Sequence, residues 1–268
     1  METKLNYKRT FLIGLAFLSI CSFWQMYDNI IPLILQNTYH LGETMTGAVM
    51  ALDNVLAIFL LPVFGALSDK VHTKLGRRMP FIVAGTILAV IFMMLLPMID
   101  NAEKARWGTV ESFSNQVIFL AVLFFTLVSM GLYRSPAVAL MPDVTPNHLR
   151  SRANAVINLM GAVGGVYALI MIKVLVGKGE TPDYLPLFAS IAAVMAIAVG
   201  ILVMTIRENK LREEVEKAEA AIAETIEEKA MAEGVEAVGE IEAVGDTGEI
   251  KSFDGKKQTG KTEGTKGM

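Results

Sequence analysis

Cysteine is nearly absent from this sequence of 268 residues, in which Cys21 is the only one. A single cysteine excludes a disulfide or a cysteine metal site within one chain. Nucleophile–base pairs, metal-ligand clusters and phosphate-binding loops are also missing, so the sequence predicts neither an enzyme nor a bound metal or cofactor. Its basic residues are spread over several short segments rather than gathered on one face, which argues against a nucleic-acid partner.

Charged residues are scarce before residue 206, where the chain consists of six long apolar runs. A helix that crosses a bilayer needs about 20 largely apolar residues at a rise of about 1.5 Å per residue. The runs are apolar on nearly all sides, whereas the helices of soluble proteins keep a polar face. We therefore predict an all-α membrane protein whose transmembrane helices occupy residues 11–35, 46–67, 80–98, 117–141, 153–176 and 185–206.

Beyond the sixth run the composition becomes charged, with small residues between the charges. Residues 207–233 are rich in Ala, Glu and Lys and predict a charged cytoplasmic helix. Its apolar residues recur at the spacing of a soluble helix or a short coiled coil. They are Leu211, Val215, Ala218 and Ile222. Gly, Glu, Lys and Thr dominate residues 234–268, which is typical of disorder. The predicted organisation is therefore a transmembrane domain at 1–206, then the charged helix and a disordered tail.

Basic residues near the ends of the runs indicate the orientation of the chain. Lysine and arginine in short loops beside membrane spans stay in the cytoplasm. The loop between the second and third runs carries four of them, Lys70, Lys74, Arg77 and Arg78. The loops expected on the other side hold only Lys104, Arg106 and Lys178. We therefore predict a multi-pass protein of the cytoplasmic membrane, with both termini in the cytoplasm and the lipid bilayer as its partner.

Asp53 lies near the middle of the second run, next to Asn54. A carboxylate inside a membrane span is costly unless it is paired or faces water, and desolvation favours its protonated form. Asp53 is therefore either a protonatable coupling group or the acceptor of a structural hydrogen bond from Asn54 or another helix. We favour coupling, because intramembrane acids are functional by default. Asp28, near the outer end of the first run, either shares such a role or reaches the interface.

The second half of the first run is unusually polar for a membrane span. Aromatic rings pack on the C–H faces of sugars and amides bind hydroxyl groups, so we predict a sugar-binding face here. Its members are Trp24, Gln25, Tyr27 and Asn29. Trp24 can equally serve ordinary packing, and Tyr27 can equally anchor the helix at the interface.

The fourth and fifth runs contain further candidates. Arg134 either binds a substrate group, pairs with Asp53, or extends to the inner interface as long basic side chains do. Asn158 either contributes to the same binding face or joins two helices by a hydrogen bond. Gly161 and Gly165 form a GxxxG pair, which lets another helix approach closely.

The segment between the second and third runs, GALSDKVHTKLGRRMPFI at residues 65–82, resembles the signature loop of the major facilitator superfamily. The residues that match its pattern are Gly65, Asp69, Gly76, Arg77 and Arg78. The spacing is similar to that of sucrose transporters and of the related glycoside–pentoside–hexuronide cation symporters. Met79 departs from this pattern, because a third basic residue is usual at its position.

A second segment, residues 135–165, resembles the junction of the fourth and fifth helices in the same branch. The residues that fit are Asp143, Arg152, Ala153 and Asn154. Sucrose transporters carry an important arginine in this region. Val138 occupies its place here, and the resemblance carries the role to Arg134, one turn earlier. The sodium-binding acids of the symporters would fall near Ala57 and Leu61, so a proton is the expected coupling ion.

The resemblance implies a charged latch at the cytoplasmic surface that ties the second, third and fourth helices together in one state of alternating access. Its members are Gly65, Asp69, Gly76, Arg77, Arg78 and Asp143. The alternative is that Arg77 and Arg78 only set the topology of the chain.

The resemblance also implies a fold of twelve helices, in two six-helix halves around a midplane site, of which residues 11–206 resemble the N-terminal half. We expect a secondary transporter, half or truncated, that moves a sugar- or glycoside-type solute by proton-coupled alternating access. A homodimer or a second six-helix half would complete its cavity. The alternative is a non-transporting remnant, a membrane scaffold or a partner subunit.

Overall fold

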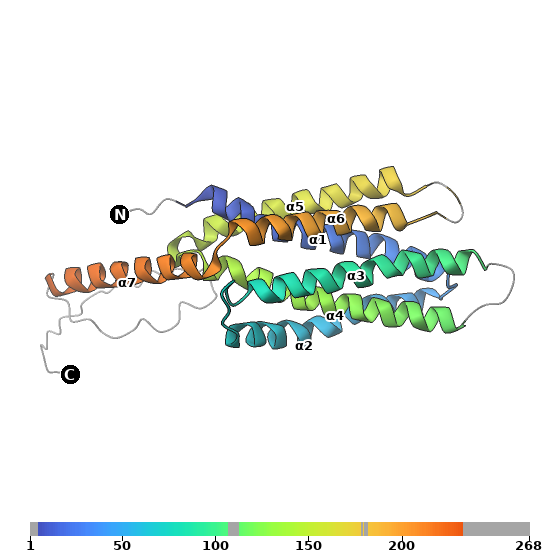
Figure 1. Ribbon diagram of the computed structural model, residues 1–268, viewed down its shortest axis with the longest axis horizontal. Helices are drawn as coiled ribbons and strands as arrows, with labels where there is room; N and C mark the ends of the chain where they lie inside the picture. The colour runs from blue at the N-terminus through green and yellow to red at the C-terminus, as the bar shows by residue number, and fades with distance from the viewer. Residues whose placement is uncertain (1–4, 107–112, 178, 180–181, 233–268) are drawn as a thin grey trace, which may run out of the picture. The chain divides into compact units, whose positions relative to one another are not determined.

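The structure is a computed structural model that describes residues 5–106, 113–177, 179 and 182–232. Six of the described helices are long and apolar enough to cross a membrane, which confirms the predicted all-α membrane fold. They are α1 (Tyr7–Asn37), α2 (Glu43–Lys70), α3 (Met79–Lys104), α4 (Phe113–Asp143), α5 (Arg150–Leu175) and α6 (Leu185–Thr205). The 3₁₀ turn η1 (Asn147–Leu149) precedes α5, and α7 (Glu208–Ala232) follows α6 (Figure 1).

The helices extend beyond several of the apolar runs, and α3 shows the largest difference. Predicted to end at residue 98, it continues to Lys104 and so includes Asp100 and Glu103. The apolar run stops before these two residues because they are polar. The helix nevertheless continues, because their side chains find hydrogen-bond partners inside the protein. Lys178 and the predicted disordered tail at 234–268 lie outside the described residues.

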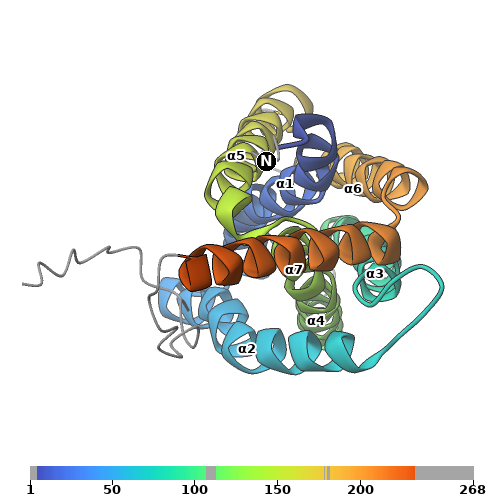
Figure 2. The same ribbon diagram turned by 90° about the vertical axis from the view of Figure 1, so that its left-hand side faces the viewer.

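The six long helices form two groups of three (Figure 2). α1 packs along α5 and α6, and α4 packs along α2 and α3. The groups meet where α3 contacts α6 and where α1 contacts α2 and α4. Helices that are distant in the sequence therefore fix one another's positions around the centre of the unit.

α1 and α5 cross closely because glycines lie at their contact. An ideal Cβ atom on Gly164 would overlap the main-chain carbonyl of Leu18, and one on Gly161 would approach a side-chain sulfur of α1 to 2.9 Å. The Ser22 hydroxyl donates a hydrogen bond to the carbonyl of Gly164 at 2.9 Å. The GxxxG pair at Gly161 and Gly165 is therefore covered by a helix of the same chain.

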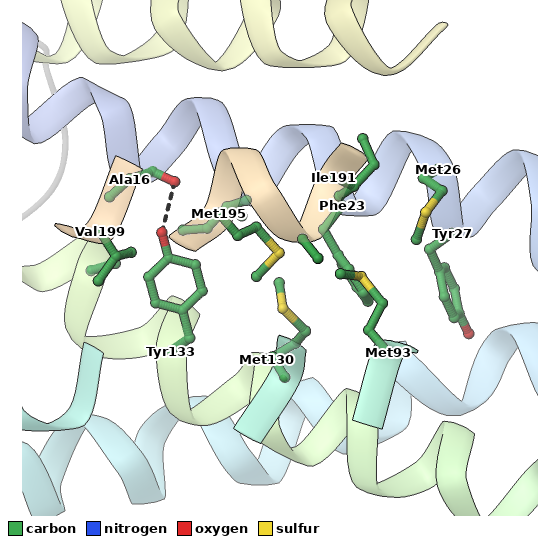
Figure 3. Packing of buried hydrophobic residues seen from close by; sticks show 14 of the residues in the cluster. Ala16, Phe23, Met26, Tyr27, Met93, Met130, Tyr133, Ile191, Met195 and Val199 are labelled. Atoms are coloured by element: carbon green, nitrogen blue, oxygen red, sulfur yellow. Dashed lines mark hydrogen bonds between the residues drawn. The ribbon is translucent and has the colours of Figure 1, made fainter. Parts of the chain in front are cut away.

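Aromatic and methionine side chains fill the space between the two groups of helices (Figure 3). Tyr133 of α4 is fully buried, and its hydroxyl donates to the carbonyl of Ala16 at 3.1 Å. The same hydroxyl shares a hydrogen bond of 2.6 Å with Ser19. Met130 and Met195 face each other beside this contact, and such flexible side chains fill irregular gaps well. The hydrogen bonds fix α4 against α1 and so position the pocket described below.

The chain forms two compact units, Met1–Ile222 and Ala223–Met268, and of the second the structure describes only the last turns of α7. The first turns of α7 belong to the larger unit. Leu211 and Val215 are buried there, in a groove that Ile13 of α1 also lines. The apolar spacing of this helix therefore serves packing on the ends of the transmembrane helices.

Candidate functional site

A small pocket lies between α1, α2 and α4, about halfway along α1 and α2. The residues that line it are Trp24, Asp53, Leu56, Ala57, Leu60, Leu61, Leu127, Gly131 and Arg134. Its volume of about 20 Å³ holds little more than one water molecule. Three of the candidate residues, Trp24, Asp53 and Arg134, meet here, one from each helix.

The inner face of α2 brings Asp53 to the pocket. Asp53, Ala57 and Leu60 recur at helical spacing and are only partly exposed, whereas the residues on the opposite side of α2 are exposed. The Asn54 amide donates a hydrogen bond to Asp53 Oδ1 at 3.0 Å. The structural hydrogen bond considered for Asp53 is thus present, and it leaves the carboxylate at the wall of the pocket.

Arg134 faces the pocket from α4 and lies over the ring of Trp24. The guanidinium carbon is 5.5 Å from the ring centroid, within the range of a cation–π interaction. The ion pairs among the described residues do not include one between Arg134 and Asp53, although both line the same small space. Two opposite charges therefore face one pocket without a direct contact between them.

Tyr27 packs among aromatic rings next to the pocket. Its ring centroid lies 5.4 Å from that of Trp24 and 6.1 Å from that of Phe23. Only 1% of Tyr27 is exposed, which does not fit an anchor at the membrane interface. Within the described part of the chain, Trp24 Nε1 and the Tyr27 hydroxyl are buried without a hydrogen-bond partner. Such groups normally bind water or a ligand, so this cluster has unused hydrogen-bonding capacity.

Four other candidates do not line the pocket. Asp28 and Asn29 are exposed on α1, and the Asn29 amide donates to the main-chain carbonyl of Gln25 at 2.7 Å. The Gln25 side chain lies near a glycine of α5, and Asn158 is exposed on α5. Asp28 remains within electrostatic range of Asp53. The close α1–α5 contact fixes the rotation of both helices about their axes and so places these side chains outside the lining.

Four charged residues meet where α2 ends, α3 begins and α4 ends. The guanidinium of Arg78 binds Asp69 at 2.6 Å and Asp143 at 3.0 Å. Arg77 binds the same oxygen of Asp143 at 3.1 Å and lies 3.8 Å from Asp69. Arg78 is only 6% exposed, so its charge depends on these partners. These are the four charged members of the charged latch, and they join three helices by charge-assisted hydrogen bonds.

Two glycines shape the latch. Arg78 donates to the main-chain carbonyl of Gly65 at 3.1 Å, and an ideal Cβ atom on Gly65 would lie 3.3 Å from the Ser135 hydroxyl of α4. Gly65 therefore keeps α2 close to α4. Gly76 has a φ angle of 127°, which residues with a side chain rarely adopt, and it makes the turn that leads into α3.

Glu208, the first residue of α7, is a part of this region that the sequence reasoning missed. Its buried carboxylate accepts hydrogen bonds from the main-chain N–H groups of Arg77, Arg78 and Met79, at 2.8 to 3.1 Å. These groups form the start of α3, where the helix dipole favours a negative charge. A Cβ atom on Gly76 would overlap this carboxylate, so the glycine is also needed for its approach.

Further contacts hold α7 beside the latch. The Asn209 amide donates to the main-chain carbonyl of Thr73 at 3.0 Å, and Arg9 of α1 forms an ion pair with Glu214 at 2.9 Å. Figure 2 shows the start of α7 passing across the ends of α3 and α4. The sequence signal for this arrangement was the apolar spacing of α7, which indicates a packed face but not its partner.

The chain matches a protein-family model described as the Major Facilitator Superfamily over residues 6–245. It is similar to a sucrose transport protein of Arabidopsis thaliana, 34% identical over 116 residues that make up 41% of this chain and 22% of that protein. A sucrose transport protein of Oryza sativa subsp. japonica is 26% identical over 137 residues, 48% of this chain and 27% of that protein. An uncharacterised symporter of Synechocystis is 24% identical over 144 residues, 52% of this chain and 25% of that protein. The alignments thus span about a quarter of the length of these relatives.

Proposed function

We propose that this chain, which belongs to the major facilitator superfamily, takes part in moving a sugar-type solute across a membrane by proton-coupled alternating access. The superfamily match and the six apolar helices make it a multi-pass membrane protein of a transporter family. The class of solute, the coupling ion and the transport mechanism are proposals, and each is argued below from particular residues.

The observation that carries the proposal is the meeting of Asp53, Arg134 and Trp24 at one pocket within the spans. A charged pair inside a membrane span is costly and is typical of a substrate or ion pathway. Protonation of Asp53 would remove its attraction for Arg134 and leave the guanidinium free to bind a solute hydroxyl. Proton binding at Asp53 and solute binding at Arg134 would then be linked, which is the requirement for coupled transport.

The aromatic cluster supports a sugar as the solute. The ring of Trp24 provides a flat apolar surface, and Trp24 Nε1 and the Tyr27 hydroxyl have hydrogen-bonding capacity to spare in the described structure. Two of the similar proteins are named as sucrose transport proteins. Sucrose is therefore the first solute to test.

The pocket of about 20 Å³ is far smaller than a sugar, so solute binding requires the helices around it to separate. The charged latch is the proposed restraint on this motion, because its ion pairs join α2 and α4, which both line the pocket. A set of ion pairs that breaks on opening gives the two discrete states that alternating access needs. The basic residues beside the latch place this end in the cytoplasm in our proposal.

A second set of six helices would complete the cavity. The outward face of α2 exposes Val55, Ile58, Phe59 and Val63. In a membrane these side chains contact lipid or another six-helix bundle, and we propose a homodimer or a partner half. Asp28 and Asn158, which are exposed on α1 and α5, would take part in solute binding only if such a partner brings further residues to them.

Transport by the purified chain in proteoliposomes tests the proposal. An inward proton gradient should drive uptake of radiolabelled sucrose, and Asp53→Asn should reduce this uptake to the level without a gradient. Asn54→Ala is the matched control, because it removes the hydrogen bond to Asp53 and keeps the carboxylate. Full proton coupling in Asp53→Asn would discard the assigned role.

The alternative, a scaffold or partner subunit without transport of its own, has a distinct outcome. The intact chain would then insert into liposomes and move no solute with or without a gradient. The closed pocket is the observation that favours this alternative.

A further inference from the structure

A buried polar cluster lies at the far end of α3, away from the charged latch. There α3 carries Asp100, which is 0% exposed, and Glu103, which is 7% exposed. Buried carboxylates are costly unless partners satisfy them. Neither residue lines the pocket or belongs to the latch, so the proposed function leaves both without a role.

Lys104 links this cluster to the segment that leads into α6. Its ammonium group donates to Asp100 Oδ2 at 2.5 Å and to the main-chain carbonyl of Pro182 at 2.7 Å. It also lies 4.4 Å from the ring centroid of Tyr184. Asp100 supplies the counter-charge that keeps Lys104 in this position, and Lys104 in turn ties α3 to the segment before α6.

Other elements meet the cluster. The Thr38 hydroxyl, just after α1, lies beside the Asp100 carboxylate. Asn115 of α4 donates to Glu103 at 2.5 Å, and Asn101 donates to Asp183 at 2.7 Å. The titratable groups described in interaction with Asp100 or with its neighbours include Tyr39, Glu103, Lys104, Asp183 and Tyr184.

Two atoms of the cluster have no hydrogen-bond partner within the part of the chain that the structure describes. They are Asp100 Oδ1 and the Tyr39 hydroxyl oxygen, and both are buried. Lys104 forms an ion pair with Asp100, whereas Glu103 accepts its described hydrogen bond from Asn115. Asp100 Oδ1 is thus a buried acceptor oxygen that the described hydrogen bonds leave unpaired.

The surrounding titratable groups keep their charge state near neutral pH. Burial, followed by the nearby charge of Asp100, raises the pKa of the Tyr39 and Tyr184 hydroxyls, so both stay neutral. Hydrogen bonds from the Asn101 amide and from the main-chain N–H of Leu185 lower the pKa of Asp183, so it stays ionised. A change of charge in the cluster therefore falls on the α3 residues.

We propose that Asp100 binds a proton from the outer solution and that this proton releases Lys104, which unties α3 from the segment leading into α6. The proton adds to Oδ1, the oxygen without a partner in the described structure. An ammonium group that has lost its counter-charge is costly to keep buried, and the flexible lysine side chain can carry it to water. That this end of α3 lies on the outer side follows from the orientation in the proposed function.

Hydrogen–deuterium exchange of the full chain in lipid nanodiscs tests this site. After correction for intrinsic exchange, residues 182–188 should exchange about tenfold faster at mildly acidic pH than at neutral pH. Asp100→Asn should exchange at the fast rate at both pH values. Asp183→Asn is the control and should keep the difference between the two conditions.

Lys104→Met is a second test, which does not require Asp100→Asn to fold. In this variant too, the exchange rate of residues 182–188 should no longer depend on pH. The proposal is overturned if either variant exchanges at the wild-type rate with the wild-type dependence on pH, or if exchange in the wild type does not depend on pH. In sealed vesicles, a response to interior acid alone overturns the assignment to the outer side. The readout needs no transport, so its failure leaves the transport proposal to be judged by the sucrose assay.

Discussion

Glu208 holds the start of α7 against the start of α3, and glutamine at this position tests how much that contact contributes. The carboxylate accepts hydrogen bonds from the main-chain N–H groups of Arg77, Arg78 and Met79. Only 1% of Glu208 is exposed, so water cannot replace these bonds while α7 stays in place. Glu208→Gln keeps the shape of the side chain but turns one acceptor oxygen into an NH₂ donor that faces main-chain donors.

The size of the effect follows from these bonds. A hydrogen bond to a charged group contributes about 1.5–3 kcal/mol, and a negative charge at a helix N-terminus contributes about 0.3–1 kcal/mol. Glutamine keeps one accepting oxygen and loses at least one of the bonds. We expect a loss of about 2–3 kcal/mol, which makes detachment of α7 from α3 roughly 30- to 160-fold more frequent.

Limited digestion with trypsin measures this detachment, because Lys210 and Arg212 lie in the first turns of α7. The cleavage rate follows the population of the open form when opening is fast relative to cleavage. Glu214→Gln is the matched control, since Glu214 forms an exposed ion pair with Arg9 that contributes only about 0–1 kcal/mol. Equal cleavage rates for Glu208→Gln and Glu214→Gln would refute the reasoning.

The glycine contact, the latch and the polar cluster each allow a further test. Gly164→Ala should lower thermal stability in micelles by about 1–3 kcal/mol, because its Cβ atom would overlap a carbonyl of α1, whereas Gly200→Ala, with nothing within 4 Å, should not. Asp143→Asn should reduce the free energy that keeps the latch closed by about 3 kcal/mol. It should also broaden the distribution of distances between spin labels on α2 and α5. The pKa of Asp183 is lowered by its hydrogen bonds, so its ionised form contributes stability above the usual aspartate pKa, which is lost as pH falls through the lowered value. Asn101→Ala should move this titration, followed by carboxyl ¹³C NMR, to higher pH.

The transmembrane helices could be predicted because few backbone conformations are stable in lipid. Every main-chain polar group must be satisfied within the helix, so each long apolar run becomes one helix. The meeting of Arg78 with Asp69 and Asp143 was also within reach of the sequence, because all three lie at ends of runs expected on the same side. In these cases residue type and position along a span decide the structure.

Other features depend on details that hydropathy does not contain. Glu208 binds main-chain N–H groups about 130 residues away, and no side-chain pattern marks such partners. α3 continues past its apolar run because other segments help to satisfy its polar end: Asn115 donates to Glu103, and Lys104, the partner of Asp100, also donates to Pro182. Gln25 and Asn158 were expected on the binding face but do not line the pocket, because rotation of α1 and α5 about their axes follows from glycine contacts.

Among the six membrane-spanning helices, α2 is the one that the described contacts restrain least, and it carries Asp53. No residue in the most apolar stretch of α2 is buried within the described structure, and the helix packs mainly on α4. At the latch end it is held by Asp69 and by the hydrogen bond from the Ser135 hydroxyl to the carbonyl of Leu61, at 2.7 Å. At the other end, the described hydrogen bonds of the polar cluster join α3 to α4 and to the segment before α6, and they involve no side chain of α2. In the proposed mechanism, α2 therefore pivots about its latch end while the latch is closed. Once the latch opens, α2 would move as a whole and carry Asp53 away from Arg134, the displacement that a pocket of about 20 Å³ would need before it admits a solute.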